Sequence, residues 1–363
     1  MTVVNEALVK SSLLRERFRL DVLPMRFARD FSDIGSLRPS KFLAMAGVAL
    51  QLAIRLAFRR PDAVYMTPTP TGMSFVRDAM FASIMNLFAM RKIFHLHGKG
   101  VRSAYDRSLF YRLLYRWVFW GAHIIHLSKR LSSDVSGIVR ADRIHVVANG
   151  IAPPAPRVRS GAVTRTGPPV LLYLSNIMRA KGVFVLLDAL RILSAEGVDF
   201  HADFAGAPND TETLQDFHDA CAEAPLRGSA DYAGLVTGDA KDRLFRGADI
   251  FVMPTLFDAF PLVALEAMAY ALPVVCSEEG SLPDIVRDDE TGILVEKGNA
   301  PALAAALKSL LLDPERRRRM GDAGRKRYEE NFTLEQLEAN LAAALDECLA
   351  AWQRPTSRGR AGS

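Results

Sequence analysis

The sequence predicts an α/β protein built from two doubly wound, Rossmann-like domains that face each other across a cleft. Short apolar segments alternate with helix-length segments along the chain, and a proline-rich stretch divides it near the middle. Apolar strands that are separated by helices form βα units and parallel sheets. A length of 363 residues is sufficient for two domains of ordinary size, each with its own core.

The domain boundary is predicted at residues 151–169, which hold five prolines and show no apolar period. Such a composition is typical of a linker. We therefore expect an N-terminal domain at 1–150, a linker at 151–169 and a C-terminal domain at 170–350. The polar end of the chain, 351–363, is predicted to be disordered.

Each domain contains several strand candidates of apolar and β-branched residues. In the first domain these candidates are 19–25, 63–68, 92–98, 122–128 and 143–149. In the second domain they are 170–176, 199–206, 230–236, 248–255, 272–278 and 291–297.

Composition excludes several classes of protein. The three cysteines have no pair spacing, which argues for a reducing compartment and against a disulfide framework or a zinc site. With no secretory signal visible, a cytoplasmic location is expected. Residues 1–150 hold 23 Lys and Arg against 10 Asp and Glu, whereas the remainder holds 23 against 31. The basic half is predicted to face an anionic partner, and no nucleic-acid motif is present.

Two apolar segments of the basic half have alternative interpretations. Residues 44–58 are interrupted by Gln51 and Arg55 and are too short to span a bilayer, so we predict a buried helix. Residues 108–120 interleave aromatic side chains with Arg112 and Arg116. This segment is either a core helix with arginines in solvent or a helix that lies on the inner, anionic face of a membrane.

The segment 254–275 places two acids eight residues apart, after one predicted strand and before another. Asp258 lies in the loop, and a helix is predicted to begin near Pro261. Leu262, Val263 and Ala264 would then offer free N–H groups to a phosphate. Glu266 would follow one helical turn later, where its carboxylate reaches a diol such as a ribose. The alternative is an ordinary strand–loop–helix in which the acids are merely near a helix start.

A second loop follows the predicted strand at 170–176. Lys181 and Gly182 close this loop, and Arg179 lies beside them. Basic side chains at this position would clamp a pyrophosphate, or they would simply be solvated.

These motifs together resemble the retaining glycosyltransferases of family four, also called group 1 glycosyltransferases, which have the GT-B architecture. The resemblance covers about 170–345 and, more weakly, the first domain. It is carried by Lys181–Gly182, by FAGAP at 204–208, by YAGLV at 232–236, by the two-acid segment and by TGILVEKGN at 291–299.

The resemblance implies a role for each matching residue. The lysine corresponding to Lys181 contacts the donor diphosphate, and the acid corresponding to Asp258 contacts the transferred sugar. The backbone from Phe260 through Pro261 and Leu262 to Val263 holds phosphate and sugar, and Glu266 holds the ribose. His97, at the end of the predicted strand 92–98, matches a histidine close to the transferred sugar, although His95 on the same strand face is an alternative match.

The sequence departs from the family pattern at three places. Asp258 stands where a glutamate is usual. Ser175 and Asn176 replace a usual Gly-Arg pair, so Asn176 would line the phosphate pocket and Arg179 would supply the missing charge. Residues 1–14 read as the first helix, so the first strand of the N-terminal domain is expected to be missing.

The sequence therefore predicts a hexosyltransferase-type enzyme that moves a sugar from a nucleotide-diphosphate sugar with retention. The expected acceptor is a glycan or a polyprenyl-phosphate-linked molecule of surface polysaccharide or glycolipid biosynthesis. Neither a metal nor another cofactor is expected, because Lys181 and helix N–H groups suit the departing phosphate. The alternatives are a non-catalytic relative that binds a nucleotide or a protein and, with a poorer motif match, a sugar-nucleotide epimerase.

Overall fold

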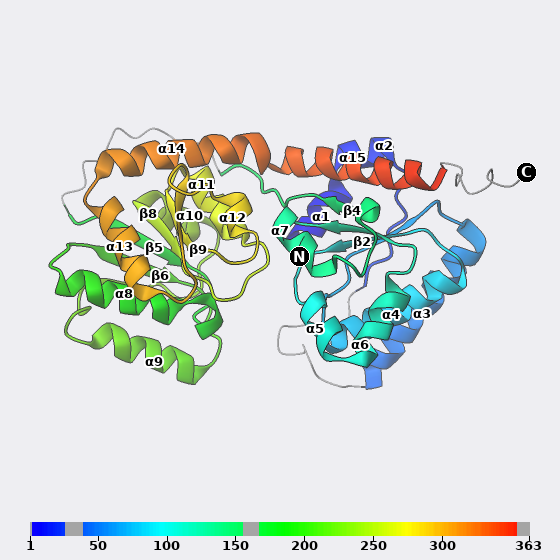
Figure 1. Cartoon of the computed structure of the whole chain (residues 1–363), viewed down its shortest axis with the longest axis horizontal. Coiled ribbons are helices and arrows are strands. Elements are labelled where there is room, and N and C mark those ends of the chain that lie inside the picture. The colour runs from blue at the N-terminus through cyan, green and yellow to red at the C-terminus, as the bar shows by residue number, and fades with distance from the viewer. Residues whose placement is uncertain (1, 26–38, 155–166, 354–363) are drawn as a thin grey trace, which may run out of the picture. The chain divides into compact units, whose positions relative to one another are not determined.

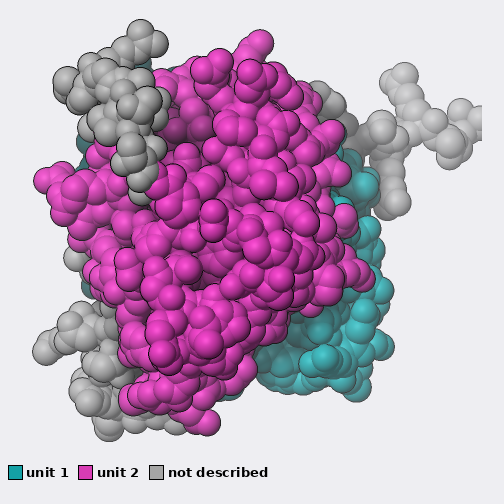
Figure 2. All heavy atoms as spheres, turned by 90° about the vertical axis from the view of Figure 1, so that its left-hand side faces the viewer, with its two compact units in different colours: residues 1–148, 338–363 teal, residues 149–337 magenta. Residues whose placement is uncertain are grey.

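The computed structural model describes residues 2–25, 39–154 and 167–353, which form two compact units (Figure 1). Unit 1 comprises residues 1–148 and 338–363, and unit 2 comprises residues 149–337 (Figure 2). The boundary near residue 150 is close to the expected one. Residues 338–350, which we assigned to the C-terminal domain, instead pack with unit 1 because the last helix continues out of unit 2.

Unit 1 is built on a parallel sheet whose strands follow chain order, β1-β2-β3-β4. Its strands are β1 (Val64–Met66), β2 (Lys92–Leu96), β3 (His123–His126) and β4 (Ile144–Val146). Its helices are α1 (Thr2–Lys10), α2 (Ser12–Arg17), α3 (Pro39–Arg59), α4 (Gly72–Leu87), α5 (Val101–Arg107), α6 (Leu109–Val118), α7 (Lys129–Ser132) and most of α15 (Leu334–Gln353).

Unit 2 is a doubly wound parallel sheet with the order β10-β9-β8-β5-β6-β7. Its strands are β5 (Val170–Leu174), β6 (His201–Ala205), β7 (Ala230–Tyr232), β8 (Ile250–Met253), β9 (Val274–Ser277) and β10 (Gly292–Val295). Its helices are α8 (Val183–Ala195), α9 (Thr211–Ala222), α10 (Gly238–Gly247), α11 (Leu262–Ala269), α12 (Leu282–Ile285), α13 (Ala300–Leu311) and α14 (Pro314–Asn331).

The central strands are buried on both faces because helices cover both sides of each sheet. Every residue of β2, β3, β8 and β9 is buried. Strands of this kind read as continuous apolar runs rather than as alternating patterns. This is why ten of the eleven strand predictions are confirmed and why two parallel α/β units were predictable.

The strand predicted at 19–25 is wrong. This segment runs as irregular backbone, with Leu20 and Val22 largely exposed. Asp21 pairs with Arg55 at 2.7 Å and with Arg59 at 2.6 Å, so the segment is tied to α3. The apolar alternation that predicted a strand therefore does not lead to pairing with the sheet.

The start and the end of unit 2 lie side by side. The N–H of Ile151 donates to Phe332, and the carbonyl of Ile151 accepts from the N–H of Leu334 and from the Tyr328 hydroxyl. A Cβ at Gly150 would lie 2.1 Å from the Thr333 carbonyl oxygen, so this crossing requires glycine. Most of the predicted linker and of the C-terminal tail lies outside the described residues. Residues 351–353, which we predicted to be disordered, extend α15.

Candidate functional site

The candidate site of unit 2 forms where the order of its sheet reverses. Strands β5 and β8 are neighbours in the sheet although β6 and β7 lie between them in the chain. Open parallel sheets bind ligands beyond the carboxyl ends of the two strands at such a switch point. The loop after β5 carries Lys181, and the loop after β8 carries Asp258. The two motifs singled out from the sequence are thus brought together by the sheet.

The two loops are held against each other by backbone contacts. The carbonyl of Ala180 accepts hydrogen bonds from the N–H groups of Leu256 and Phe257 at 2.9 and 3.0 Å. Gly182 has a φ of +75°, and a Cβ there would lie 1.8 Å from the Pro254 carbonyl oxygen. Only glycine permits this approach, so Gly182 sets the separation of the loops.

Lys181 and Asp258 form a direct ion pair. Lys181 Nζ lies 2.5 Å from Asp258 Oδ2, and both side chains are mostly buried. The other carboxylate oxygen, Oδ1, accepts the N–H of Ala259 at 2.8 Å. These contacts fix the orientation of the carboxylate and place a cation beside it.

A third acid, Glu279, supports the Asp258 loop, and sequence reasoning missed it. Its side chain is buried, its Oε1 accepts the Asp258 N–H at 3.3 Å and its Oε2 contacts Lys297 Nζ at 3.1 Å. The neighbouring Ser281 donates from both its N–H and its hydroxyl to the carbonyl of Ala259. The sequence signal was present, because Glu279 is the second residue after β9, a buried strand that neighbours β8.

The predicted anion position at the start of α11 is present in part. The helix begins at Leu262 after Pro261, which confirms the predicted start. Within the described residues, the N–H groups of Leu262 and Val263 donate no hydrogen bond to the protein, as expected at a helix N-terminus. Ala264, which we expected to be free, donates to the Pro261 carbonyl at 3.2 Å. Phe260 is buried beneath this turn.

Glu266 lies one turn into α11 and is held by α10. Its carboxylate contacts Lys241 Nζ at 2.6 Å, and both side chains are partly exposed. A carboxylate with free lone pairs at this position can accept hydroxyl donors from a ligand while Lys241 fixes its rotamer. Lys241 was not predicted as a site residue.

Asn176 and Arg179 are less closely tied to the site. The Asn176 carbonyl accepts the Tyr173 hydroxyl at 3.0 Å, and the residue is otherwise exposed. The Arg179 guanidinium lies over the Phe184 ring and 2.5 Å from Asp216 of α9. Within the described residues, Arg179 is therefore paired with α9 rather than with the loop of Asp258.

His97 lies at the carboxyl end of β2 in unit 1, beside two more buried histidines. The His95 and His97 rings are 4.2 Å apart between centroids, and His95 Nδ1 lies 2.7 Å from the Tyr65 hydroxyl. The buried Nε2 atoms of His95, His97 and His126 have no hydrogen-bond partner in the described structure. Burial lowers the pKa of His97 and of His126 to about 4, so both imidazoles are neutral at pH 7.

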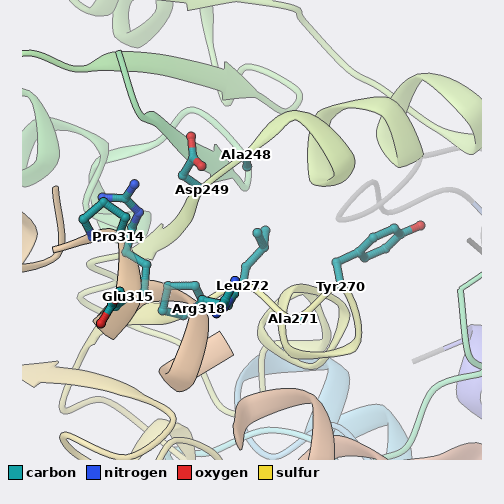
Figure 3. A pocket seen from close by; sticks show the side chains of 10 residues that line it. Ala248, Asp249, Tyr270, Ala271, Leu272, Pro314, Glu315 and Arg318 are labelled. Atoms are coloured by element: carbon teal, nitrogen blue, oxygen red, sulfur yellow. The ribbon is translucent and has the colours of Figure 1, made fainter. Parts of the chain in front are cut away.

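Other candidate sites lie away from the Lys181–Asp258 pair. A pocket of about 430 Å³ is lined by Asp249, Tyr270, Pro273 and residues of α14 (Figure 3). Asp249 and Pro273 precede β8 and β9, so this pocket lies at the amino ends of the strands, opposite the switch point. Among the described residues, two groups have metal-ligand spacing: His123, His145 and Cys348, and His201, Asp203 and Asp231. Neither group includes a residue of the predicted site.

The fold and the site define an α/β protein whose C-terminal unit presents acids, a lysine and helix N–H groups at a switch point. Residues 157–327 match the model of the family described as glycosyl transferases group 1. Over this segment, which is a little less than half of the chain, the sequence is similar to that family.

Curated relatives match a longer part of the chain than the family model does. An alpha-maltose-1-phosphate synthase of Mycolicibacterium smegmatis is 31% identical over 230 residues, which are 58% of this chain and 59% of the relative. An MMP alpha-(1->4)-mannosyltransferase of Mycolicibacterium hassiacum is 29% identical over 232 residues, 62% of this chain and 54% of the relative. The chain thus matches less than two thirds of the length of these relatives.

Solved structures share the fold of both sheets. Sucrose-phosphate synthase from Thermosynechococcus elongatus superposes with a TM-score of 0.68 at 19% identity, covering 87% of this chain and 81% of that one. Anabaena HepE in complex with UDP gives a TM-score of 0.68 at 16% identity, covering 85% and 84%. These likenesses confirm the predicted fold class.

The close approach of the loops after β5 and β8 predicts that a methyl side chain at residue 182 lowers the free energy of unfolding. Gly182→Ala should lower the free energy of unfolding by about 2–4 kcal/mol, because a positive φ and a backbone clash both oppose a Cβ. Gly228→Ala is the matched control, since Gly228 has a φ of +82° and open space around a Cβ. Its loss should be only about 1 kcal/mol. Urea denaturation followed by circular dichroism measures both, and equal losses would contradict the contact.

The buried histidines predict a loss of stability in mild acid. The unfolded chain binds a proton at each histidine with a pKa near 6.5, whereas folded His97 and His126 do so only at about 4. The unfolded state therefore holds more protons between these values, and stability falls as the pH drops from about 6.5 to 4.

The expected loss at pH 5 relative to pH 7 is about 1–2 kcal/mol for each of the two histidines. His97→Asn should make the dependence shallower, and His218→Asn, at an exposed position, should leave it unchanged. Denaturation curves at pH 7, 6 and 5 give the comparison. The same slope for wild type and His97→Asn would show that His97 is not held neutral.

Proposed function

We propose that this protein is a retaining, hexosyltransferase-type glycosyltransferase that takes its sugar from a nucleoside-diphosphate sugar. The observation that carries the proposal is the Lys181–Asp258 ion pair at the switch point of unit 2. The match of residues 157–327 to the group 1 family supports the activity class. The neighbour solved with UDP supports a uridine nucleotide as the first donor to test.

The polar groups of the site suit a departing diphosphate. Negative charge develops on the phosphate as the bond to the anomeric carbon breaks. The cation of Lys181 and the free N–H groups of Leu262 and Val263 can stabilise that charge without a metal ion. We propose metal independence on this basis, and retained turnover in excess EDTA tests it.

Asp258 and Glu266 would contact two different parts of the donor, the transferred sugar and the ribose. Asp258 would accept hydroxyl hydrogen bonds from the transferred sugar, since its carboxylate is fixed by Lys181 and Ala259. Glu266 would accept from the ribose, since it lies further along α11. Glu279 would act on Asp258 indirectly, as a positioning residue of the loop.

Retention requires that the acceptor attack the face from which the phosphate leaves, or that an enzyme carboxylate attack first. Both oxygens of Asp258 are engaged by protein donors, which favours positioning over nucleophilic attack. We therefore propose front-face attack with the leaving phosphate as base. Neutral His97 would donate to or accept from the sugar in this scheme.

We propose that the acceptor is a glycan or a polyprenyl-phosphate-linked molecule of surface polysaccharide or glycolipid synthesis. An amylovoran biosynthesis glycosyltransferase of Erwinia amylovora, 30% identical over 176 residues, supports this setting. The competing proposal is a non-catalytic relative that only binds a nucleotide. Turnover of donor, measured as released nucleoside diphosphate with candidate acceptors, separates the two.

The ion pair predicts that Asp258→Asn separates binding from catalysis. The amide loses the negative acceptor for the sugar, so transfer should fall by at least about 100-fold. UDP affinity should not fall, because Lys181 then lacks its internal counter-ion and stays available to phosphate. Calorimetric titration with UDP and an activity assay measure the two effects. Loss of UDP binding with unchanged turnover would contradict the assignment.

Lys181→Met should weaken UDP binding by about 10- to 100-fold, because one charge-assisted hydrogen bond to phosphate is lost. Lys308→Met is the matched control, since Lys308 pairs with Glu196 on the surface of α13. A melting-temperature panel with UDP, GDP and ADP checks which nucleotide binds. About 2.7 kcal/mol of stabilisation is expected at 100 times the dissociation constant. An equal loss in both variants would rule out a phosphate contact by Lys181.

A further inference from the structure

Helix α6 in unit 1 exposes a stripe of large apolar side chains. Leu109, Leu113 and Trp117 recur every four residues, and Trp120 continues their line just beyond the helix. All four are largely exposed, Trp120 by 69%. Tyr115 and Val118, on the opposite side of the helix, are buried in the core. The helix therefore packs on the core by one side, and its exposed side carries apolar residues as well as Arg116.

Helix α3 repeats the pattern. Leu43, Leu50, Ile54 and Phe58 lie on one side at helical spacing and are exposed, Phe58 by 84%. Leu52 and Leu56 on the other side are buried in the core of unit 1. The prediction of a buried helix at 44–58 thus holds for one face only.

Both helices pack against α4, so the two stripes belong to one helical layer (Figure 1). Trp117 is joined to α4 by its Nε1, which donates to Ser83 Oγ at 2.9 Å, and by its carbonyl, which accepts from Asn86. At the end of α4, Leu87 is also exposed. We name this surface the apolar face. It consists of Leu43, Leu50, Ile54, Phe58, Leu87, Leu109, Leu113, Trp117 and Trp120.

Cations flank the apolar face. Arg55 and Arg59, which share the one carboxylate of Asp21, lie beside the stripe of α3, and Arg112 and Arg116 lie beside that of α6. Residues 39–120 hold twelve Lys and Arg against three Asp. Helices that lie in a membrane interface combine these features, with Trp, Phe and Leu on one side and basic residues next to them. Tryptophan in particular prefers the depth of the lipid headgroups.

We propose that the apolar face of unit 1 binds the surface of an anionic lipid membrane, with α3 and α6 lying in the interface. None of the described helices is long and apolar enough to cross a bilayer, so this contact is interfacial. The inference does not depend on the donor site, since every residue of the face belongs to unit 1.

Charge favours a lipid surface over a second copy of the chain. Two copies that met through this face would bring their arginines together, which costs free energy in a desolvated contact. An anionic bilayer offers the opposite charge to the arginines and hydrocarbon to the leucines. The face therefore complements a lipid surface on both counts.

The test is flotation of the full chain with vesicles of phosphatidylcholine alone and with vesicles to which anionic phosphatidylglycerol is added. We expect binding to the anionic vesicles that weakens in high salt. Phe58→Gln/Trp120→Gln should bind about tenfold more weakly or worse, because two large side chains no longer enter the bilayer. Leu235→Gln/Leu312→Gln removes two exposed leucines of unit 2 and should bind like wild type.

A second readout does not depend on the variants. The chain has three tryptophans, and Trp352 packs against His123 at 4.6 Å between ring centroids. Lipids brominated in their acyl chains should quench Trp117 and Trp120 on binding. Failure of wild type to float with anionic vesicles, or equal binding by the two double variants, would overturn the proposal. The proposal would also be overturned if the wild-type chain bound no vesicles but self-associated, and if this self-association were lost in Phe58→Gln/Trp120→Gln.

Discussion

The candidate site depends on one close backbone contact between the two loops at the switch point. Gly182 approaches the carbonyl of Pro254 so closely that no side chain fits, and Ala180 accepts two N–H groups of the opposite loop. A parallel sheet alone would bring the ends of β5 and β8 near each other but would not fix the separation of their loops. The contact does so, and thereby sets Lys181 against Asp258. Glycine is required here for lack of space as much as for its positive φ.

Three lysine–carboxylate pairs surround the site, and the lysines reduce the repulsion that unpaired carboxylates would exert on a diphosphate. Lys181 pairs with Asp258, Lys241 with Glu266 and Lys297 with Glu279. The acids that we propose to hold sugar hydroxyls would repel a diphosphate if they were left unneutralised. The paired lysines cancel this repulsion, and the helix N-terminus of α11 adds an attractive field. Hydroxyl recognition and phosphate binding can therefore coexist within a few residues.

Unit 1 has an apolar core, but two features set it apart from a simple globular domain. It buries His95, His123 and His126 and half-buries His97 next to its sheet, where desolvation lowers the pKa of all four, and it exposes leucine, phenylalanine and tryptophan on α3 and α6. Both choices lower the stability of the isolated unit in water. Such costs are usual where a surface or a polar cluster serves binding rather than folding. The roles that we propose are contact of His97 with the transferred sugar and contact of the apolar face with a lipid surface.

The sequence by itself determined the alternation of strands and helices, the split near residue 150 and the motif residues Lys181, Asp258 and Glu266. These follow from local patterns, since buried strands read as apolar runs and helix starts carry recognisable residues. Strand pairing, the partners of Arg179 and the role of Glu279 were decided by tertiary structure. So was the failure of 19–25 to form a strand, because Asp21 is held by the arginines of α3. Which side of α3 and α6 meets solvent also depended on packing, since helices that are apolar around most of their circumference carry no broad polar face to mark the outside.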